Sequence, residues 1–337
     1  MEIKEAIRTI VASQNLRHED AHHVADEIMS GNVTDAQIAA LLVALRLKGE
    51  TIDEITGFAE AMREKATPIQ CDADCIIDTC GTGGDQSNTF NISTLSAIVA
   101  AGAGCKVAKH GNRSVSSRCG SADLLIELGV NVEMSPEDVS RCIDEIGIGF
   151  LFAPSLHKAM RYAIGPRREI GIRTIFNILG PLTNPAGAKR QLLGVFDGDL
   201  TELLARVLMK LGSEHVLVVH GEDGLDEITL TDKTRVSELR NGKIKNYFLK
   251  PERFHFDRVK LEKIRGGEPA ENARIALDVL HGVHGAARDL VIFNAGASVY
   301  VSGLSESIEK GIQLSRESID SGKALEKLEA LKKMTHS

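Results

Sequence analysis

The sequence predicts an α/β protein with a small all-helical amino-terminal domain and a larger α/β domain built on a mainly parallel central sheet. Three observations support this prediction. Residues 1–66 show only helical spacing of apolar side chains, the chain from residue 71 alternates short apolar runs with helical segments, and loops that contain glycine and hydroxyl residues follow the first two runs. Such alternation implies crossover helices, which place neighbouring strands in parallel.

The amino-terminal helices are predicted from apolar spacing and from their first residues. Apolar side chains recur at helical intervals at Ile3, Ala6, Ile7, Ile10 and Val11, and again at Ile38, Leu41, Leu42 and Leu45. Thr34 is a candidate N-cap, and Thr51 with Glu54 forms a candidate capping box. We therefore expect a helical domain over residues 1–70, completed by an insertion near residues 165–187, and an α/β domain over residues 71–337.

The larger domain is predicted element by element. Strands are expected at residues 75–79, 105–108, 148–152, 192–196 and 216–220, with antiparallel additions around 234–249. Helices are expected at residues 94–101, 122–128, 136 onward after Ser135, 200–211, 270–282 and 287–300, followed by one charged carboxy-terminal helix.

Composition limits the classes of function. The net charge of −7 argues against a non-specific nucleic-acid binder, and no apolar run is long enough to span a bilayer. The first residues lack the apolar core of a signal peptide, so we expect a cytoplasmic protein without nucleic-acid or membrane partners. The six cysteines match no zinc-site spacing and are interpreted as buried or incidental thiols.

The first glycine-rich loop is Gly81-Thr82-Gly83-Gly84-Asp85, followed by Asn91-Ile92-Ser93-Thr94. It is neither a Walker A loop nor a dinucleotide fingerprint, and a glycine-rich turn alone is as often structural as functional. Hydroxyls at a helix start can contact phosphate or metal; plain N-capping is the structural alternative for Ser93 and Thr94, and both roles can coexist.

The second loop is Lys109-His110-Gly111-Asn112-Arg113-Ser114-Val115-Ser116-Ser117. Lysine, arginine and three serines at a strand end can hold a pyrophosphate, while a solvated basic turn is the simpler alternative. Two such loops at neighbouring strand ends indicate one ligand with more than one phosphate.

Two further features bear on chemistry. Asp226 and Glu227 precede an apolar run at residues 228–230 that is expected to be a strand, and they form a candidate magnesium site or an exposed acidic turn. Arg167 could pair with a carboxylate-bearing substrate or form a salt bridge on a helix surface.

Taken together, these motifs resemble those of the anthranilate phosphoribosyltransferases. The resemblance extends over nearly the whole chain. It rests on both of these loops, on Thr89-Phe90, on residues 173–185, on Gly224-Leu225-Asp226-Glu227 and on Asn294-Ala295-Gly296-Ala297. It implies a nucleoside phosphorylase/phosphoribosyltransferase-like fold, a homodimer formed through the helical domain, and transfer of phosphoribosyl from phosphoribosyl pyrophosphate to anthranilate in tryptophan biosynthesis.

The resemblance also implies roles for individual residues. Phosphoribosyl pyrophosphate would contact Gly81, Gly84, Asp85, Thr89, Asn91, Ile92, Ser93, Thr94, Lys109, His110, Gly111, Asn112, Arg113, Ser114, Val115, Ser116, Ser117 and Ser121. Anthranilate would contact Gly81, Asn112 and Arg167, and two Mg²⁺ ions would be bound through Ser93, Asp226 and Glu227. No catalytic base is assigned, with His110 as the candidate.

Two alternatives remain open from the sequence. A pyrimidine nucleoside phosphorylase shares this architecture, although the His110-Gly111-Asn112 triplet favours the transferase. A non-catalytic nucleic-acid-binding relative should be basic and should have lost these motifs, whereas this chain is acidic and retains them.

Overall fold

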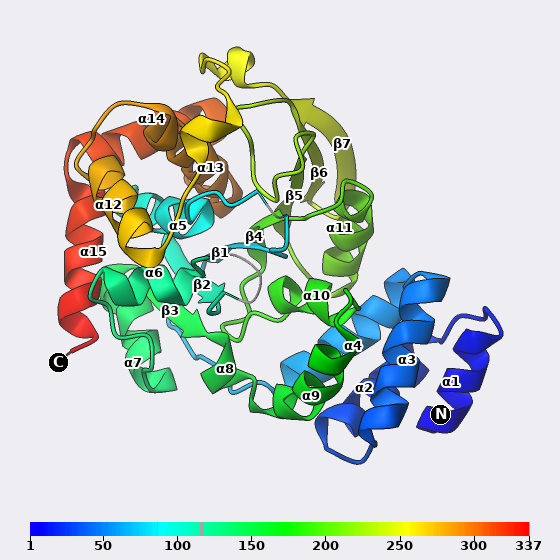
Figure 1. The fold of residues 1–337 in the computed structure, drawn as a ribbon. Coiled ribbons are helices and arrows are strands. Elements are labelled where there is room, and N and C mark those ends of the chain that lie inside the picture. Colours follow the sequence, from blue (N-terminus) through cyan, green and yellow to red (C-terminus); the bar gives the residue numbers. More distant parts are fainter. Residues whose placement is uncertain (86, 115–117, 337) are drawn as a thin grey trace.

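The structure is a computed structural model, and it describes residues 1–85, 87–114 and 118–336. Its centre is a seven-stranded sheet (Figure 1). In spatial order the strands are β3 (Ile148–Phe152), β2 (Lys106–Gly111), β1 (Ile76–Gly81), β4 (Arg190–Gly194), β5 (His215–Gly221), β6 (Thr234–Arg240) and β7 (Lys243–Leu249). The first five are parallel, and β6 and β7 extend the sheet in antiparallel fashion.

The winding of the sheet reverses between β1 and β4. From β1 the chain proceeds to β2 and β3 on one side, and it then returns to place β4 and β5 on the other side. Crevices outside the carboxyl ends of strands at such a reversal are the usual ligand sites of open α/β sheets. The fold therefore directs attention to the ends of β1 and β4, where Gly81 pairs with Gly194.

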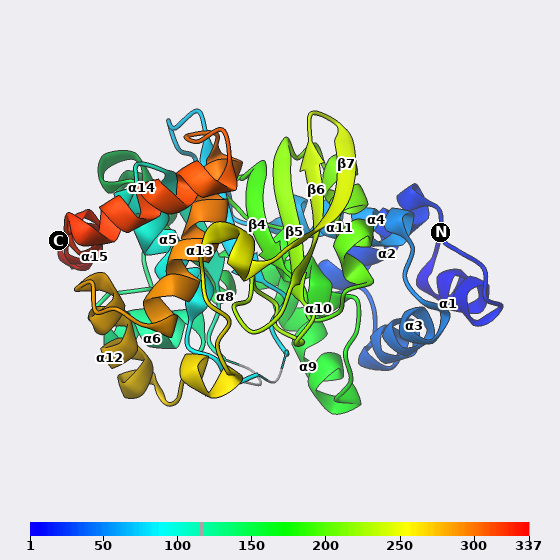
Figure 2. The same cartoon turned by 90° about the horizontal axis from the view of Figure 1, so that it is seen from above.

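Helices cover both faces of the sheet (Figure 2). After the amino-terminal domain they are α5 (Ile92–Gly102), α6 (Ser121–Glu127), α7 (Pro136–Arg141), α8 (Ala153–Leu156), α9 (Arg161–Ile170), α10 (Phe176–Leu179), α11 (Leu200–Lys210), α12 (Pro269–Leu280), α13 (Ala286–Ser302), α14 (Ile308–Asp320) and α15 (Lys323–Met334). Successive strand side chains point to opposite faces, so Leu192 joins one apolar core, which includes residues of α5 and α13, while Leu193 joins another, which includes residues of α11.

The amino-terminal helices are α1 (Ile3–Val11), α2 (His18–Met29), α3 (Asp35–Lys48) and α4 (Ile52–Lys65). Their apolar residues belong to the same core as Leu193 and α11, and α9 packs against α3. Phe58 of α4 meets Phe176 of α10 edge to face, with ring centroids 6.2 Å apart. These contacts agree with an insertion that rejoins the helical domain, and the domain boundaries themselves stay a prediction.

Several local predictions are confirmed. Thr34 and Thr51 both cap helices in complete capping boxes, and the Ser135 hydroxyl accepts a hydrogen bond from the backbone N–H of Asp138. The strand expected at residues 148–152 has those bounds in β3.

No helix in the described part of the chain is long and apolar enough to cross a bilayer.

Two predictions of local structure are wrong. Residues 228–230 do not form a strand, because a side chain, and not a neighbouring strand, binds the backbone of Ile228. The Asn294 amide accepts a hydrogen bond from the N–H of Ile228 and donates one to its carbonyl. The carboxy-terminal segment contains two helices rather than one, since Gly322, with φ of +81°, separates α14 from α15.

Candidate active site

Asp226 lies over the two glycines at the reversal of the sheet. A Cβ at Gly81 would come within 2.5 Å of Asp226 Oδ2, and a Cβ at Gly194 would overlap the Asp226 carbonyl oxygen. The backbone N–H of Gly83 donates to Asp226 Oδ2 at 2.7 Å. The glycines at the ends of β1 and β4 thus allow a carboxylate from a distant loop to reach the switch point.

Ser93 connects the other predicted carboxylate to the second loop. Its backbone N–H donates to Glu227 Oε1 at 3.1 Å, and the Lys109 ammonium donates to Ser93 Oγ at 3.3 Å. Lys109 Nζ also binds the carbonyl of Thr79 at 2.6 Å. The structure therefore brings together Ser93, Asp226 and Glu227, the three residues predicted for metal binding, with Lys109 beside them.

The electrostatics of this cluster suit a divalent cation. The pKa of Asp226 is raised to about 7, mainly by loss of solvent and secondly by repulsion from Asp85. Desolvation and the charge of Asp226 raise the pKa of Glu227 well above its usual value. A bound cation would remove this penalty, and oxygen ligands are those that Mg²⁺ prefers.

The side chains in the described ranges would leave part of a metal's coordination open. Among them, no three His, Cys, Asp or Glu groups are arranged to enclose an ion. Mg²⁺ typically keeps several waters and shares substrate phosphates rather than occupying an all-protein cage. The donor set of Asp226, Glu227 and the Ser93 hydroxyl fits a metal bound together with a phosphorylated ligand.

Asp78, which the sequence analysis missed, binds the backbone of the second loop from inside the sheet. It is fully buried in β1, and its carboxylate accepts from the backbone N–H of His110 at 3.1 Å and from the Asn184 amide at 2.8 Å. Desolvation raises its pKa, while the nearby Lys109 charge opposes that shift. An acidic residue inside the apolar run Ile76-Ile77-Asp78 is the sequence signal that could have identified it.

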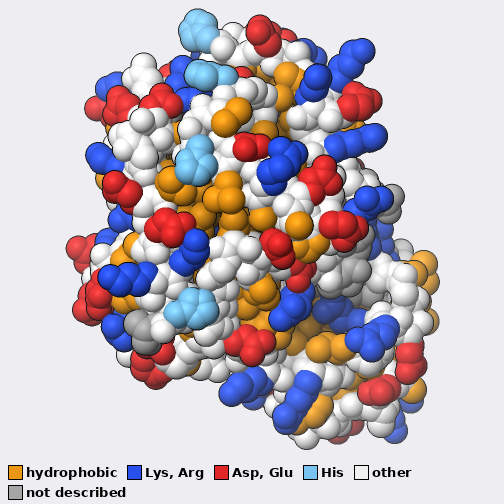
Figure 3. Space-filling model, turned by 60° about the vertical axis from the view of Figure 1, so that its left-hand side comes forward, with side chains coloured by type: hydrophobic (Ala, Val, Ile, Leu, Met, Phe, Trp, Pro, Cys, Tyr) orange, Lys and Arg blue, Asp and Glu red, His pale blue; other side chains and the backbone are white. Residues whose placement is uncertain are grey.

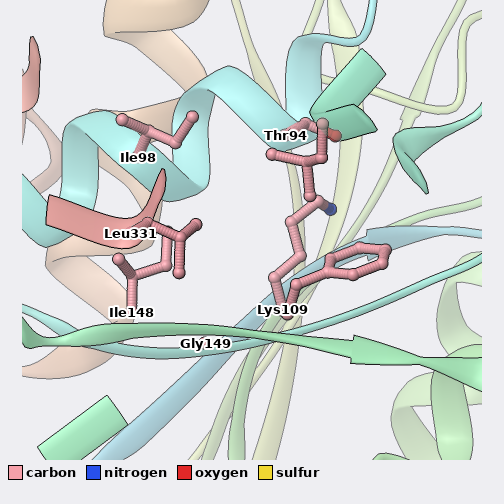
Figure 4. A pocket seen from close by; sticks show the side chains of 8 residues that line it. Thr94, Ile98, Lys109, Ile148, Gly149 and Leu331 are labelled. Carbon is pink, nitrogen blue, oxygen red and sulfur yellow. The ribbon is translucent and has the colours of Figure 1, made fainter. Parts of the chain in front are cut away.

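Lys109 runs between the sheet and α5. Figure 4 shows its side chain rising from β2 toward Thr94 at the start of α5. Burial lowers the pKa of the Lys109 ammonium, and the charge of Asp78 opposes that shift. The cavity beside its methylene stem measures only about 10 Å³ and has an apolar lining, so it is no substrate site.

The described part of the second loop is shaped by Asp123. Its Oδ2 accepts from the backbone N–H groups of Ser114 at 3.0 Å and Gly120 at 2.9 Å, and Arg113 lies 3.7 Å from Oδ1. The predicted contacts Gly111, Asn112 and Ser121 lie at the end of β2, just after it and at the first residue of α6. Val115, Ser116 and Ser117 fall outside the described residues.

Asn91 joins three segments around the first loop. Its amide donates to the carbonyl of Cys119 at 3.0 Å and accepts from the Asn272 amide at 3.0 Å. Asn272 also accepts from the backbone N–H of Gly267, and Thr89 pairs with Arg265 in an isolated β-bridge. The sequence analysis assigned Asn91 and Thr89 to the ligand but missed residues 265–272, for which no motif gave a signal.

His110 pairs with a second buried histidine, His157, with ring centroids 5.0 Å apart. Burial, and next the neighbouring His157, lower the pKa of His110 to about 3, and burial lowers that of His157 to about 4. Both rings are therefore neutral at pH 7. Within the described chain the buried His110 Nε2 has no hydrogen-bond partner.

Two arginines differ in their relation to the glycine-rich turn. Arg167, on α9, lies over the Phe176 ring at 5.3 Å, and burial lowers its pKa. Arg173, which the sequence analysis did not assign, donates to the carbonyl of Gly84 and stacks on Phe196 at 4.1 Å. Arg173 thus holds the turn, while no described hydrogen bond joins Arg167 to either loop.

The face of the molecule seen in Figure 3 is not uniformly basic. On the face in Figure 3, acidic and basic side chains are interspersed, and Lys and Arg gather beside a hollow toward its lower right. Attraction of an anion would therefore act at short range in this acidic chain.

Comparison with known proteins gives matches over nearly the whole chain. Residues 4–66 match the helical bundle domain of a glycosyl transferase family, and residues 73–325 match its a/b domain. Anthranilate phosphoribosyltransferase of Pelotomaculum thermopropionicum is 54% identical over 99% of this chain and 96% of its own. That of Thioalkalivibrio sulfidiphilus is 52% identical over the full length of both chains.

Solved structures give the same result. A crystal structure of anthranilate phosphoribosyltransferase from Thermus thermophilus matches with a TM-score of 0.94 and 44% identity, covering 98% of this chain and 99% of that one. The Saccharomyces cerevisiae enzyme in complex with PRPP and Mg matches with a TM-score of 0.90 and 29% identity, covering 99% and 98%. The same yeast enzyme with 4-fluoroanthranilate has a TM-score of 0.89.

Proposed function

The chain belongs to the anthranilate phosphoribosyltransferase family, and we propose that it transfers the phosphoribosyl group of phosphoribosyl pyrophosphate to the amine of anthranilate. The products are N-(5-phosphoribosyl)anthranilate and pyrophosphate, in tryptophan biosynthesis. The observation that carries this proposal is the convergence of Ser93, Lys109, Asp226 and Glu227 at the topological switch point.

The arrangement suits departure of pyrophosphate from a sugar carbon. Negative charge grows on the leaving group as the bond breaks, so preorganised positive groups at that position lower the barrier. The backbone N–H groups of the two loops and the Lys109 ammonium supply such groups from fixed positions. Attack by the aromatic amine needs no prior deprotonation, because that amine is neutral at pH 7.

Magnesium completes the charge balance in this proposal. Asp226 and Glu227 would hold Mg²⁺ together with the Ser93 hydroxyl, and we expect two ions per active site. When bound, the metal supplies Lewis-acid stabilisation of the phosphate oxygens. The yeast relative in complex with PRPP and Mg supports its use here.

The remaining substrate contacts are proposed from the positions of these residues in the motifs shared with the family. We assign the donor to Gly81, Gly84, Asp85, Thr89, residues 91–94, residues 109–117 and Ser121, including those of them outside the described ranges. Gly81, Asn112 and Arg167 are the proposed contacts for anthranilate, whose carboxylate matches a guanidinium. His110, neutral because of its pKa of about 3, would act as a hydrogen-bonding group rather than as a base.

We further propose a homodimer formed through the helical domain, in the cytoplasm. Val11 and Leu47, near the ends of α1 and α3, are 70% and 83% exposed, which favours a partner on this side. Cys71, Cys75, Cys80, Cys105 and Cys142 are free thiols, as a reducing compartment would keep them.

Loss of anthranilate fluorescence with phosphoribosyl pyrophosphate tests the activity directly. We expect loss in the presence of magnesium and none after chelation. A folded protein that leaves the fluorescence unchanged would refute the proposed acceptor, and phosphorolysis of uridine or thymidine would then test the nucleoside phosphorylase alternative.

A further inference from the structure

A cleft with two arginines lies beside the first loop, outside the residues assigned to either substrate. Its volume is about 350 Å³, within the range of small-molecule sites. Among the described residues, its lining consists of Ser87, Asn88, Arg118, Leu261, Arg265 and Gly266. The charged residues among them are both basic, so the lining favours an anion.

The segment that carries Arg265 is fastened to the first loop. Thr89 bridges to Arg265, and the backbone N–H of Gly266 donates to the carbonyl of Asn88 at 2.9 Å. A Cβ at Gly266 would approach Asn272 Oδ1 to 2.5 Å and the Phe90 nitrogen to 2.6 Å. Glycine at this position is therefore what allows the backbone before it to lie directly on the loop.

Arg118 is tied to the same loop from the other side. Asn91 donates to the carbonyl of Cys119, the residue after Arg118, and accepts from Asn272, which binds the backbone N–H of Gly267. The side-chain amides of Asn91 and Asn272 thus link the segments that carry the two arginines. Their positions depend on the loop residues Thr89 and Asn91, so the cleft and the donor site form one assembly.

Neither guanidinium is neutralised within the described chain. Arg118 and Arg265 are exposed and form no ion pair with any described residue, whereas arginines such as Arg113, Arg141 and Arg258 each contact carboxylates. Glu262 and Glu268 belong to the same segment as Arg265 but do not line the cleft. Two unpaired guanidinium groups in one cleft are suited to bind phosphate oxygens.

We propose that Arg118 and Arg265 form an anion seat for a phosphate or pyrophosphate group at the rim of the donor site. This inference rests on the proposed function for its biological ligand, which is either a phosphate of the incoming donor or the departing pyrophosphate. The seat binds and orients the anion and takes no part in bond breaking, so its arginines are positioning residues.

The direct test is a calorimetric titration of the full-length protein with pyrophosphate. It is carried out with magnesium present and again after magnesium is chelated. The variants are Arg118→Gln, Arg265→Gln and the double variant. Arg253→Gln is the matched control, because Arg253 is also exposed, forms no ion pair with a described residue and lies outside the cleft lining. Thermal melting checks that all variants are folded.

We expect each single variant to raise the Kd of pyrophosphate about three- to tenfold, the effect of losing one screened charge-assisted contact. The double variant should raise the Kd of pyrophosphate further, and Arg253→Gln should have the same Kd as the unaltered protein. Differences that shrink as salt is added would agree with a screened ionic contact. A double variant within twofold of the control, or no pyrophosphate binding by the unaltered chain, overturns the proposal.

Steady-state kinetics then separate the two sources of the anion. A fall in kcat/KM for phosphoribosyl pyrophosphate, with KM for anthranilate unchanged, assigns the seat to the donor. A rise in the pyrophosphate inhibition constant alone assigns it to the product. Because the titration needs no turnover, failure of the transferase assay with a positive titration refutes the proposed function and leaves the seat standing.

Discussion

At the scale of residues, the cluster around Asp226 and Glu227 combines unfavourable charge with fixed geometry. Both carboxylates have raised pKa values because they lose solvent and repel each other and Asp85. Backbone N–H groups of Gly83 and Ser93 nevertheless hold them in place. Such strain between like charges is expected where a cation is the intended partner.

The double variant Asp226→Asn with Glu227→Gln should therefore lose magnesium-dependent turnover by at least about 10²-fold, the effect typical of removing one preorganised electrostatic group. Its stability should not fall, because the amide oxygens can still accept the two backbone hydrogen bonds and the repulsion is gone. Turnover across a magnesium series and a thermal melt measure both effects. Turnover close to that of the unaltered enzyme would remove these carboxylates from the mechanism.

Arg167 is the residue that tests acceptor binding. Arg167→Ala should raise KM for anthranilate about tenfold or more, since a charge-assisted hydrogen bond contributes about 1.5–3 kcal/mol. KM for the sugar donor should change little, and Arg167→Lys should recover part of the loss. An equal rise in both KM values would instead indicate that its stacking on Phe176 is structural.

At the scale of elements, strand ends decide where the loops can lie. β1 and β4 both end in glycine, and Asp226 occupies the space that side chains there would need. At the opposite ends of the strands, Glu238 of β6 accepts hydrogen bonds from His215 of β5, Tyr247 of β7 and Tyr300 of α13. The carboxyl ends of the parallel strands thus form the candidate ligand site, whereas hydrogen bonds to Glu238 join the elements at the opposite end of the sheet.

Gly194→Ala should displace Asp226, since its Cβ would overlap the Asp226 carbonyl oxygen. We expect at least about a tenfold loss of kcat and a destabilisation of about 1–3 kcal/mol, as in other overpacked sites. Gly180→Ala is the control, because it has a helical φ of −48° and nothing lies within 4 Å of its Cβ. Full activity in Gly194→Ala would show that the Asp226 loop can shift without cost.

The Glu238 cluster predicts an acid-dependent loss of stability. Burial alone would raise the pKa of Glu238, but the hydrogen bonds from His215, Tyr300 and Tyr247 outweigh it and lower the pKa to about 2. The resulting stabilisation, on the order of 2–3 kcal/mol, is complete above the unfolded value near 4.5 and is lost as pH falls toward 2.

Denaturant titrations of the unaltered protein and of Glu238→Gln, taken at a series of pH values, measure this contribution. The stability difference between them should be constant near neutrality and should shrink as pH falls below about 4.5. A difference that keeps its size down to the lowest pH at which the protein folds would contradict the assignment.

At the scale of the whole molecule, the helical domain and one face of the sheet share a single apolar core. The outer side of the helical domain, at α1 and α3, lies away from the α/β domain (Figure 1). Val11 and Leu47 are exposed on these two helices. The interface of the proposed dimer would lie on this side.

Leu47→Asp should convert the proposed dimer to a monomer, because an interfacial charge without a partner is costly to bury. Leu304→Asp, at another exposed leucine but on the α/β domain, should leave the dimer intact. Light scattering after gel filtration measures the mass of each. A Leu47→Asp dimer, or a monomeric unaltered protein, would refute an interface at this position.

The local structure of this protein could be predicted from the order of its residues. Helical spacing, the caps at Thr34 and Thr51, the strand at residues 148–152 and the glycine-rich loops depend on near neighbours, so the predicted elements agree with the structure except at residues 228–230 and near Gly322. Motif order was also enough to indicate the family.

The tertiary structure alone decided how distant residues combine. Gly83 meets Asp226 and Ser93 meets Glu227 across more than 130 residues of chain, and no motif signalled the contacts of Asn272 or the Arg118–Arg265 cleft. These contacts depend on strand order, since the reversal between β1 and β4 sets which loops face one another. Sequence neighbours determine the elements, whereas the packing of the whole sheet determines the site.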